Sequence, residues 1–231
     1  PYFIEADSGA TSPGDYLLTG MVQNPAGRVF TIDEIAWQLT NNGEAFFNSA
    51  EAAAFNVGAD GQLSVNVTAL TTQGQTLARA ALQTWTDLTG IQFVETTGTA
   101  EISFDDSAAG RVANANTVIS GTTITSATVM LSTGWLTRFG TSFNSYSFET
   151  YIHEIGHALG LGHGGNYNNS ATFGTSNYYQ NDSVAYSIMS YMNAIGDEFV
   201  GPNTFVNADF RFMLTPVVAD FVAIDRLYGS S

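Results

Sequence analysis

Apolar residues recur with a helical period in four stretches of the sequence. Residues 75–88 form the clearest of these, with a single apolar face and Gly90 at the place where a helix would end. A shorter helix is predicted for residues 31–39, because Thr31 and Glu34 have the spacing of a capping box. The pattern also predicts helices over 148–161 and 215–229, the last with Thr215 as N-cap and Pro216 as its first residue.

Alternating apolar and polar residues predict strands between these helices. Residues 63–69 alternate with period two, and residues 91–95 and 100–104 are two further short candidates. The stretch 118–131 is rich in threonine, valine and isoleucine, and Gly121 marks a turn near its start. From the order of strands and helices we expect an α+β domain.

Two segments show no clear period. Residues 1–20 are rich in Gly, Ser, Thr, Pro and Asp, and we interpret them as an N-terminal arm. Residues 164–202 are rich in Gly, Asn, Ser and Tyr and are predicted to be mostly loop. The chain of 231 residues, 44% of them apolar, is long enough to bury one large core or two small lobes around a cleft.

The charge of the chain disfavours two classes of partner. There are 21 acidic and 6 basic residues, which gives a net charge of −15. Such a surface repels phosphate backbones and anionic lipids, so neither nucleic acid nor a membrane surface is expected as a partner. No apolar run approaches the roughly 20 residues that cross a bilayer. Cysteine is absent, so neither a disulfide nor a cysteine nucleophile or ligand can form.

The main chemical signal is the segment from His153 to His163, HEIGHALGLGH, which has the form H-E-x-x-H-x-x-G-x-x-H. His153 and His157 are one helical turn apart, so both imidazoles project from the same face of a helix. Gly160 can break the helix and turn the chain, which brings His163 round as a third ligand. Three protein ligands leave one position open, as in catalytic zinc sites.

Glu154 has the place of a general base in this motif. It lies beside His153, within reach of a water on the metal but not itself a ligand. All three histidines of the chain belong to the motif, so a set of unrelated surface or core histidines is a poor explanation. A metal-activated water with Glu154 as its base would hydrolyse an amide bond.

A second signal follows at Ser187-Ile188-Met189-Ser190-Tyr191. By itself, a buried methionine indicates no more than a core residue. After the long histidine motif, however, this sequence has the form of the Met-turn of metzincin proteases.

Together these segments resemble the serralysin family of bacterial metalloproteases. The resemblance is strong from about residue 148 and rests on HEIGHALGLGHGGNYN, YSIMSYM and the tail PVVADFVAIDRLYG; it is looser over TLARAALQTWTDLTG and IQFVE. It implies a two-lobed metzincin domain with a twisted mixed sheet, an active-site helix, a Met-turn and a C-terminal helix. It places the catalytic domain at 21–231, with an upper lobe of about 21–163 and a lower lobe of about 164–231.

The resemblance also assigns roles. It implies a secreted zinc endopeptidase in which His153, His157 and His163 hold one zinc ion and Glu154 is the base. Met189 corresponds to the methionine beneath the metal. Tyr191 corresponds to a tyrosine that ligates zinc at rest and swings away to stabilise the transition state. Polypeptide substrates, a monomer, a proteinaceous inhibitor and calcium ions without a specified position complete these expectations.

Two features depart from the family pattern. The family usually has proline after the third histidine and aspartate soon afterwards, whereas this chain has Gly164 and Asn166. Family members also usually continue into glycine-rich calcium-binding repeats, which would begin near Ser231. The first difference leaves the expected chemistry intact but makes the shape of the loop an open question.

Two other functions remain as alternatives. A zinc-dependent binding or adhesion module could use the metal to hold a carboxylate of its partner, although Glu154 argues against this reading. A zinc hydrolase of non-peptide amides is the other alternative. A closed pocket would favour the non-peptide hydrolase, and an open groove several residues long would favour a peptidase.

Overall fold

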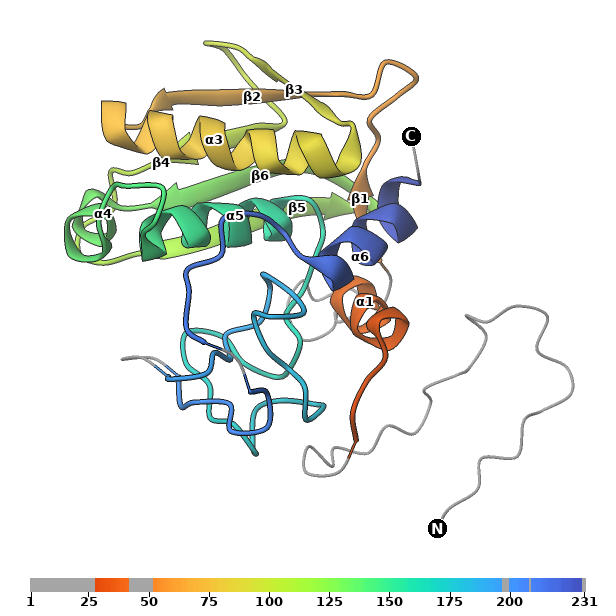
Figure 1. Ribbon diagram of the computed structural model, residues 1–231. Coiled ribbons are helices and arrows are strands. Elements are labelled where there is room, and N and C mark those ends of the chain that lie inside the picture. The colour runs from red at the N-terminus through yellow and green to blue at the C-terminus, as the bar shows by residue number, and fades with distance from the viewer. Residues whose placement is uncertain (1–27, 42–51, 197–199, 208, 230–231) are drawn as a thin grey trace, which may run out of the picture.

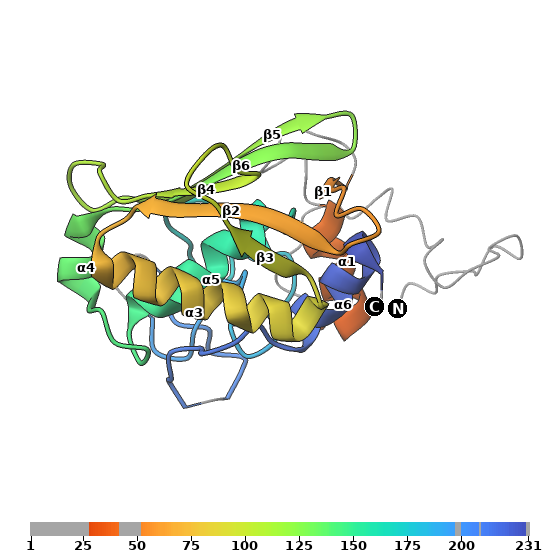
Figure 2. The same ribbon diagram turned by 90° about the horizontal axis from the view of Figure 1, so that it is seen from above.

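The fold is a six-stranded mixed sheet with helices packed on one of its faces (Figures 1 and 2). The structure is a computed structural model that describes residues 28–41, 52–196, 200–207 and 209–229. The predicted N-terminal arm, residues 1–20, lies outside the described residues. Among the described helices, none is long and apolar enough to cross a membrane.

Five strands of the sheet are parallel, and the sixth is antiparallel at one edge. The sheet order is β1-β6-β4-β2-β3. Strands β1 and β4 pair with different parts of β6, and β5 pairs with β6 along its opposite side. The strands are β1 (Ala54–Phe55), β2 (Gln62–Ala69), β3 (Gln92–Glu95), β4 (Ile102–Asp105), β5 (Ala113–Ser120) and β6 (Thr123–Leu131). The mixed sheet that the family resemblance implies is therefore present, and β5 forms its edge.

Five helices lie among the described residues. They are α1 (Ile32–Asn41), α3 (Thr72–Thr89), α4 (Thr133–Phe139), α5 (Tyr146–Ala158) and α6 (Val218–Tyr228). Helices α3 and α5 lie side by side under the sheet, and α1 packs against α6 near the start of β1 (Figure 2). The apolar residues that predicted β2 and α3 fill the space between them and are buried: Leu63, Val65, Val67, Leu77, Ala81 and Trp85.

Local capping explains where several of these elements begin and end. The predicted capping box is present at α1: the backbone N–H of Glu34 donates to Thr31 Oγ1 at 3.3 Å, and that of Thr31 donates to Glu34 Oε2 at 2.9 Å. Helix α3 is capped by Thr71 and ends at Gly90, whose φ of 74° lies in the left-handed region. Gly121, with φ of 62°, forms the predicted turn between β5 and β6.

Two elements begin elsewhere than predicted, and one helix was not predicted. Strand β5 begins at Ala113, earlier than predicted, because its first residues (Ala-Asn-Ala-Asn-Thr) carry little strand signal of their own and are held by pairing with β6. Helix α6 begins at Val218, so Thr215 and Pro216 are not its cap. Its first turn is closed by Asp220, whose Oδ2 accepts the Val217 N–H at 2.8 Å. Helix α4 was not predicted.

The end of α5 positions the site. This helix ends at Ala158, three residues before its predicted end. Gly160 then adopts a φ of +103°, and its Cα lies so close to the carbonyl oxygen of Ala53 that a Cβ would collide with it. Two hydrogen bonds close the turn, from Gly160 N to His157 O at 3.0 Å and from Leu161 N to Gly156 O at 3.0 Å. Gly160 therefore breaks the helix, as the sequence predicts. The chain continues through the segment 159–217, whose described residues contain no helix or extended strand.

Candidate metal centre

The structure brings the three histidines of the motif together at one point beneath β5. His153 and His157 project from successive turns of α5, and His163 returns to them after the turn at Gly160. Their exposed fractions are only 8%, 2% and 1%, respectively. Among the described residues, they form the only group of three or more potential metal ligands whose donor atoms converge.

Hydrogen bonds fix how these rings are turned. His153 Nδ1 lies 2.8 Å from the carbonyl oxygen of Ile188, and His157 Nδ1 lies 2.7 Å from that of Leu161. His163 has a backbone hydrogen bond at Tyr167. Because a carbonyl oxygen can only accept, each of the Nδ1 atoms facing one carries the hydrogen, so the Nε2 atom of the same ring bears the lone pair that could bind a metal ion.

The Nε2 atoms therefore face one another without a hydrogen to share. His163 Nε2 lies 3.0 Å from His157 Nε2 and 3.3 Å from His153 Nε2. Neutral nitrogen lone pairs at this separation repel, and a cation between them removes the conflict. Tetrahedral zinc, with bonds of about 2.0–2.1 Å, separates its ligands by about 3.3–3.4 Å, which is close to the spacing here. The donor set and its carbonyl partners fit a zinc ion.

Burial keeps the three histidines in the metal-binding form. It lowers the pKa of His153 to about 4, against the opposing effect of the hydrogen bond to Ile188. The pKa values of His157 and His163 also fall well below the ordinary histidine value, first through burial and then through the neighbouring imidazoles. All three rings are therefore neutral at pH 7 without a metal.

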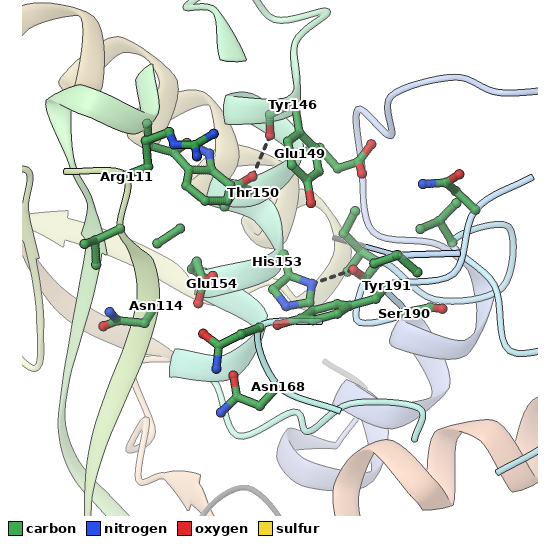
Figure 3. Close-up of a pocket in the computed structure, with 18 residues that line it drawn as sticks. Arg111, Asn114, Tyr146, Glu149, Thr150, His153, Glu154, Asn168, Ser190 and Tyr191 are labelled. Carbon is green, nitrogen blue, oxygen red and sulfur yellow. Dashed lines mark hydrogen bonds between the residues drawn. The ribbon is translucent and has the colours of Figure 1, made fainter. Parts of the chain in front are cut away.

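Glu154 lies in the same cleft, beside His153 and next to the edge strand (Figure 3). Its side chain is 6% exposed. Burial raises the pKa of its carboxyl group to about 8, and a backbone hydrogen bond from Ala115 on β5 partly opposes this shift. A carboxylate with a raised pKa is a stronger base than an ordinary glutamate.

Tyr191 lies close to His153 in the same cleft (Figure 3). The centroid of its ring is 4.6 Å from that of His163 and 5.6 Å from that of His153. Burial, followed by the charge of Glu154, raises the pKa of its phenol well above the ordinary tyrosine value, and a backbone hydrogen bond at Asn169 opposes the shift. The hydroxyl group therefore remains protonated at pH 7 and can donate a hydrogen bond.

The cleft around these residues has a volume of about 360 Å³ and is lined from two sides. One side is formed by residues 111–114 at the start of β5, and the other by residues of the loops after α5, among them Asn168, Asn193 and Val200. Residues of α5, among them His153 and Glu154, also line it. Because the cleft lies beside the edge strand β5, an extended ligand bound in it could pair with that strand.

The sequence indicated the three histidines of the candidate site but not the groups that hold them in place. The carbonyl groups of Ile188 and Leu161 orient two ligands, and Asp220 accepts the Ile188 N–H at 2.9 Å and the Ser187 hydroxyl at 2.6 Å. A series of hydrogen bonds thus connects Asp220 on α6 through Ile188 to His153. The sequence pattern could not predict this connection, because an aspartate in the first turn of a helix looks the same in the sequence whether it is buried or exposed.

Known proteins provide an independent comparison. A serralysin of Photorhabdus sp. (strain Az29) is 33% identical over 168 residues, which cover 68% of this chain and 33% of the relative. Serralysin A of Dickeya chrysanthemi is 32% identical over 67% of this chain and 32% of its own length. The metallopeptidase AprA of Pseudomonas marginalis is 27% identical over 87% of this chain and 46% of its own length. The chain thus spans 32–46% of the length of these curated relatives.

Two other comparisons add little. No protein-family model matches the chain. The crystal structure of myroilysin aligns with 45% of this chain and 44% of its own, at 23% identity and a TM-score of 0.32, which is too low to support an argument. The sequence relatives are all metallopeptidases by name, and the described residues contain a three-histidine cluster that fits a metal ion. The chain is therefore a serralysin-like sequence, related to bacterial metallopeptidases over about two thirds of its length.

Proposed function

We propose that this chain is the catalytic domain of a zinc-dependent endopeptidase that cleaves extended polypeptides. The observation that carries the proposal is the convergence of three neutral Nε2 atoms in a cleft that also contains a buried carboxylate with a raised pKa. Structural zinc sites close all four positions with protein ligands, whereas three histidines leave one position for water or substrate. The metallopeptidase relatives support the same reading.

In this proposal His153, His157 and His163 hold the zinc ion. When bound, zinc supplies Lewis-acid chemistry: it polarises a carbonyl group and lowers the pKa of water. Glu154 takes the proton from the attacking water and passes it to the leaving nitrogen. Burial raises the pKa of Glu154, and the charge of a bound zinc ion would lower it again, which would bring the pKa toward the neutral range where a group can both accept and release a proton.

Tyr191 donates a hydrogen bond to the oxyanion in the transition state. The distance of its ring from His163 and its protonated hydroxyl support this role, and ligation of the resting metal by the same hydroxyl is part of the proposal. The substrate backbone pairs with the free edge of β5, where residues 111–114 line the cleft.

The remaining features follow from the family resemblance. Residues 187–191 form the Met-turn, and the chain divides near His163 into an upper and a lower lobe. The protein is secreted, as expected for a serralysin-like protease, and acts as a monomer. A calcium ion and an inhibitory protein belong to the same set of expectations, and neither has a position in this proposal.

A casein or fluorogenic-peptide assay, combined with elemental analysis, tests the proposal. We expect one zinc ion per chain after dialysis, hydrolysis at internal peptide bonds, loss of activity with a chelator, and its return with zinc. A chain that binds zinc but cleaves no peptide would instead support the metal-dependent binding module. Full activity without metal would overturn the proposal.

A further inference from the structure

Asp182 is a buried carboxylate close to the metal centre that the proposed mechanism does not use. Its side chain is fully buried, with an exposed fraction of 0%. Its oxygens accept hydrogen bonds from two hydroxyl groups: Ser190 Oγ at 2.6 Å, and Tyr167 Oη at 3.2 and 3.1 Å. Burial raises the pKa of Asp182 to about 7, and the hydrogen bonds from Ser190 and Tyr167 oppose the shift.

Each of these two partners leads directly to a group at the metal centre. Ser190 precedes Tyr191 in the chain, and its Oγ also accepts the N–H of Met192 at 3.0 Å. The Tyr167 ring packs against both His163 and Tyr191, at centroid distances of 5.1 and 4.8 Å. One carboxylate thus joins the two segments that bring His163 and Tyr191 to the metal.

Asp182 also lies close to Gly164, the residue that follows His163. A Cβ built on Gly164 would lie 2.7 Å from Asp182 Oδ1 and 2.5 Å from the Tyr179 hydroxyl oxygen. No side chain fits there without displacing these groups, which accounts for glycine at this position. The backbone at Gly164, next to His163, is therefore packed against the side chains of Asp182 and Tyr179.

The backbone in this region cannot fix these positions by itself. Between α5 and α6 the described residues contain no helix or extended strand, so side-chain contacts must set the shape of both segments. A buried carboxylate is costly unless its oxygens are hydrogen-bonded, and a fully satisfied polar network favours one arrangement over its alternatives. Such outer partners of metal ligands typically change metal affinity or activity by about 10–100-fold when they are replaced.

We propose that Asp182 is a positioning residue that holds His163 and Tyr191 in place through Tyr167 and Ser190. The inference rests on the proposed metal site, because its effect is measured at the metal. Asp182 touches neither substrate nor metal in this proposal. It acts as the common anchor of the two segments.

The test compares Asp182→Asn with wild type in the full chain. Asparagine keeps the size of the side chain but replaces one acceptor oxygen with a donor. We expect a folded protein by circular dichroism whose zinc affinity and kcat fall by about 10–100-fold, with KM nearly unchanged. In the cobalt-substituted protein, the visible absorption bands should shift, because they report the ligand geometry and do not depend on turnover.

Asp106→Asn is the matched control. Asp106 is also buried, at 5% exposure, and accepts the N–H of Thr71 at 2.7 Å at the start of α3, outside the residues that line the cleft. It should lose stability but retain the zinc affinity and cobalt spectrum of wild type. If Asp182→Asn behaves in the same way as this control, Asp182 is only a structural residue and the inference is wrong.

If Asp182→Asn does not fold, the same measurements are made on Tyr167→Phe. It removes the hydroxyl that binds Asp182 and keeps the ring that packs on His163 and Tyr191. We expect a smaller change of the same kind, and a wild-type cobalt spectrum and kcat in the folded variant would overturn the inference. The wild-type measurement decides the proposed function separately: a wild type that binds no metal overturns both, whereas an active zinc-bound wild type with unaltered variants overturns only the role of Asp182.

Discussion

Met189 occupies the space that a side chain at position 156 would need. Gly156 lies in α5 between the two histidines, and a Cβ built on it would fall 2.5 Å from Met189 Sδ and 3.1 Å from a ring carbon of Trp85. Met189 is fully buried. The glycine of the histidine motif thus lets the segment 187–191 approach the helix that carries His153 and His157.

Gly156→Ala should destabilise the protein, although alanine is normally the better helix residue. In an open helix interior the change stabilises by roughly 0.5–1 kcal/mol, whereas overpacking a tight site costs about 1–3 kcal/mol. We expect a net loss of about 1–2 kcal/mol in the free energy of unfolding, measured by urea denaturation. In the double variant Gly156→Ala/Met189→Ala part of the collision disappears. The sum of the losses in unfolding free energy of the two single variants should therefore exceed the loss of the double variant. A stabilised Gly156→Ala would contradict this account.

Met189→Ala should act mainly on stability. Truncating a buried methionine costs about 2–5 kcal/mol, and Met189 has no chemical step in the proposed mechanism. Met189→Leu, which conserves the volume, should lose less than about 1.5 kcal/mol. Urea denaturation together with peptide kinetics separates the two effects. Unchanged stability with complete loss of activity would mean that Met189 has a direct role in catalysis.

Glu154→Gln should abolish most of the activity while the metal remains bound. The amide cannot accept the proton, and general-base catalysis typically contributes about 10²–10⁴-fold to the rate. Zinc content should barely change, because Glu154 is not a ligand in the proposal. Glu95→Gln is the control, because Glu95 is exposed and forms an ion pair with Arg79, with Oε1 at 2.6 Å from Arg79 Nε. If Glu154→Gln retains more than a tenth of the wild-type kcat, another group is the base.

Tyr191→Phe separates the two roles proposed for this residue. Loss of a hydrogen bond made only in the transition state should lower kcat by about 10²–10³-fold with KM nearly unchanged. If the phenol served only as a ligand of the resting metal, peptide hydrolysis would stay normal or become faster. Steady-state kinetics on one peptide, with zinc content checked, distinguishes these results, and Tyr178→Phe serves as a control outside the cleft lining. An unchanged kcat at full zinc occupancy would remove Tyr191 from the catalytic residues.

Zinc affinity should resist mild acid. Protons compete with the metal for the histidine nitrogens. The pKa of His153 is lowered to about 4, and those of His157 and His163 are also lowered. Protons therefore displace the metal only at a pH below the range in which ordinary histidines are protonated. Three ordinary histidines with pKa values of about 6.5 would lose roughly 10³-fold in affinity at pH 5.5. We expect a change of less than about tenfold between pH 7 and 5.5 by titration calorimetry. A thousandfold loss in a chain that circular dichroism shows to be folded would contradict the lowered pKa values.

The sequence alone predicted the parts of this protein that depend on spacing within one element. The helical period places His153 and His157 on one face of α5, and Gly160 ends that helix and turns the chain toward His163. Capping residues and alternation likewise predicted α1, α3 and β2 to within a few residues. These features could be predicted because they arise from neighbours in the chain, whose relative positions the backbone geometry of one element determines.

Tertiary structure decided which groups hold the metal residues in place. The carbonyl of Ile188 orients His153, Asp220 anchors Ile188 from α6, and Asp182 joins the segments of His163 and Tyr191. These partners are separated by 8–35 positions in the sequence, and most lie in loops without a periodic pattern. Their contacts arise only when α5, α6 and the loops pack together, because a hydrogen bond between distant residues depends on the position of both elements in space. The sequence therefore determined which residues belong to the candidate metal centre, and the packing of helices and loops against one another determined what holds them there.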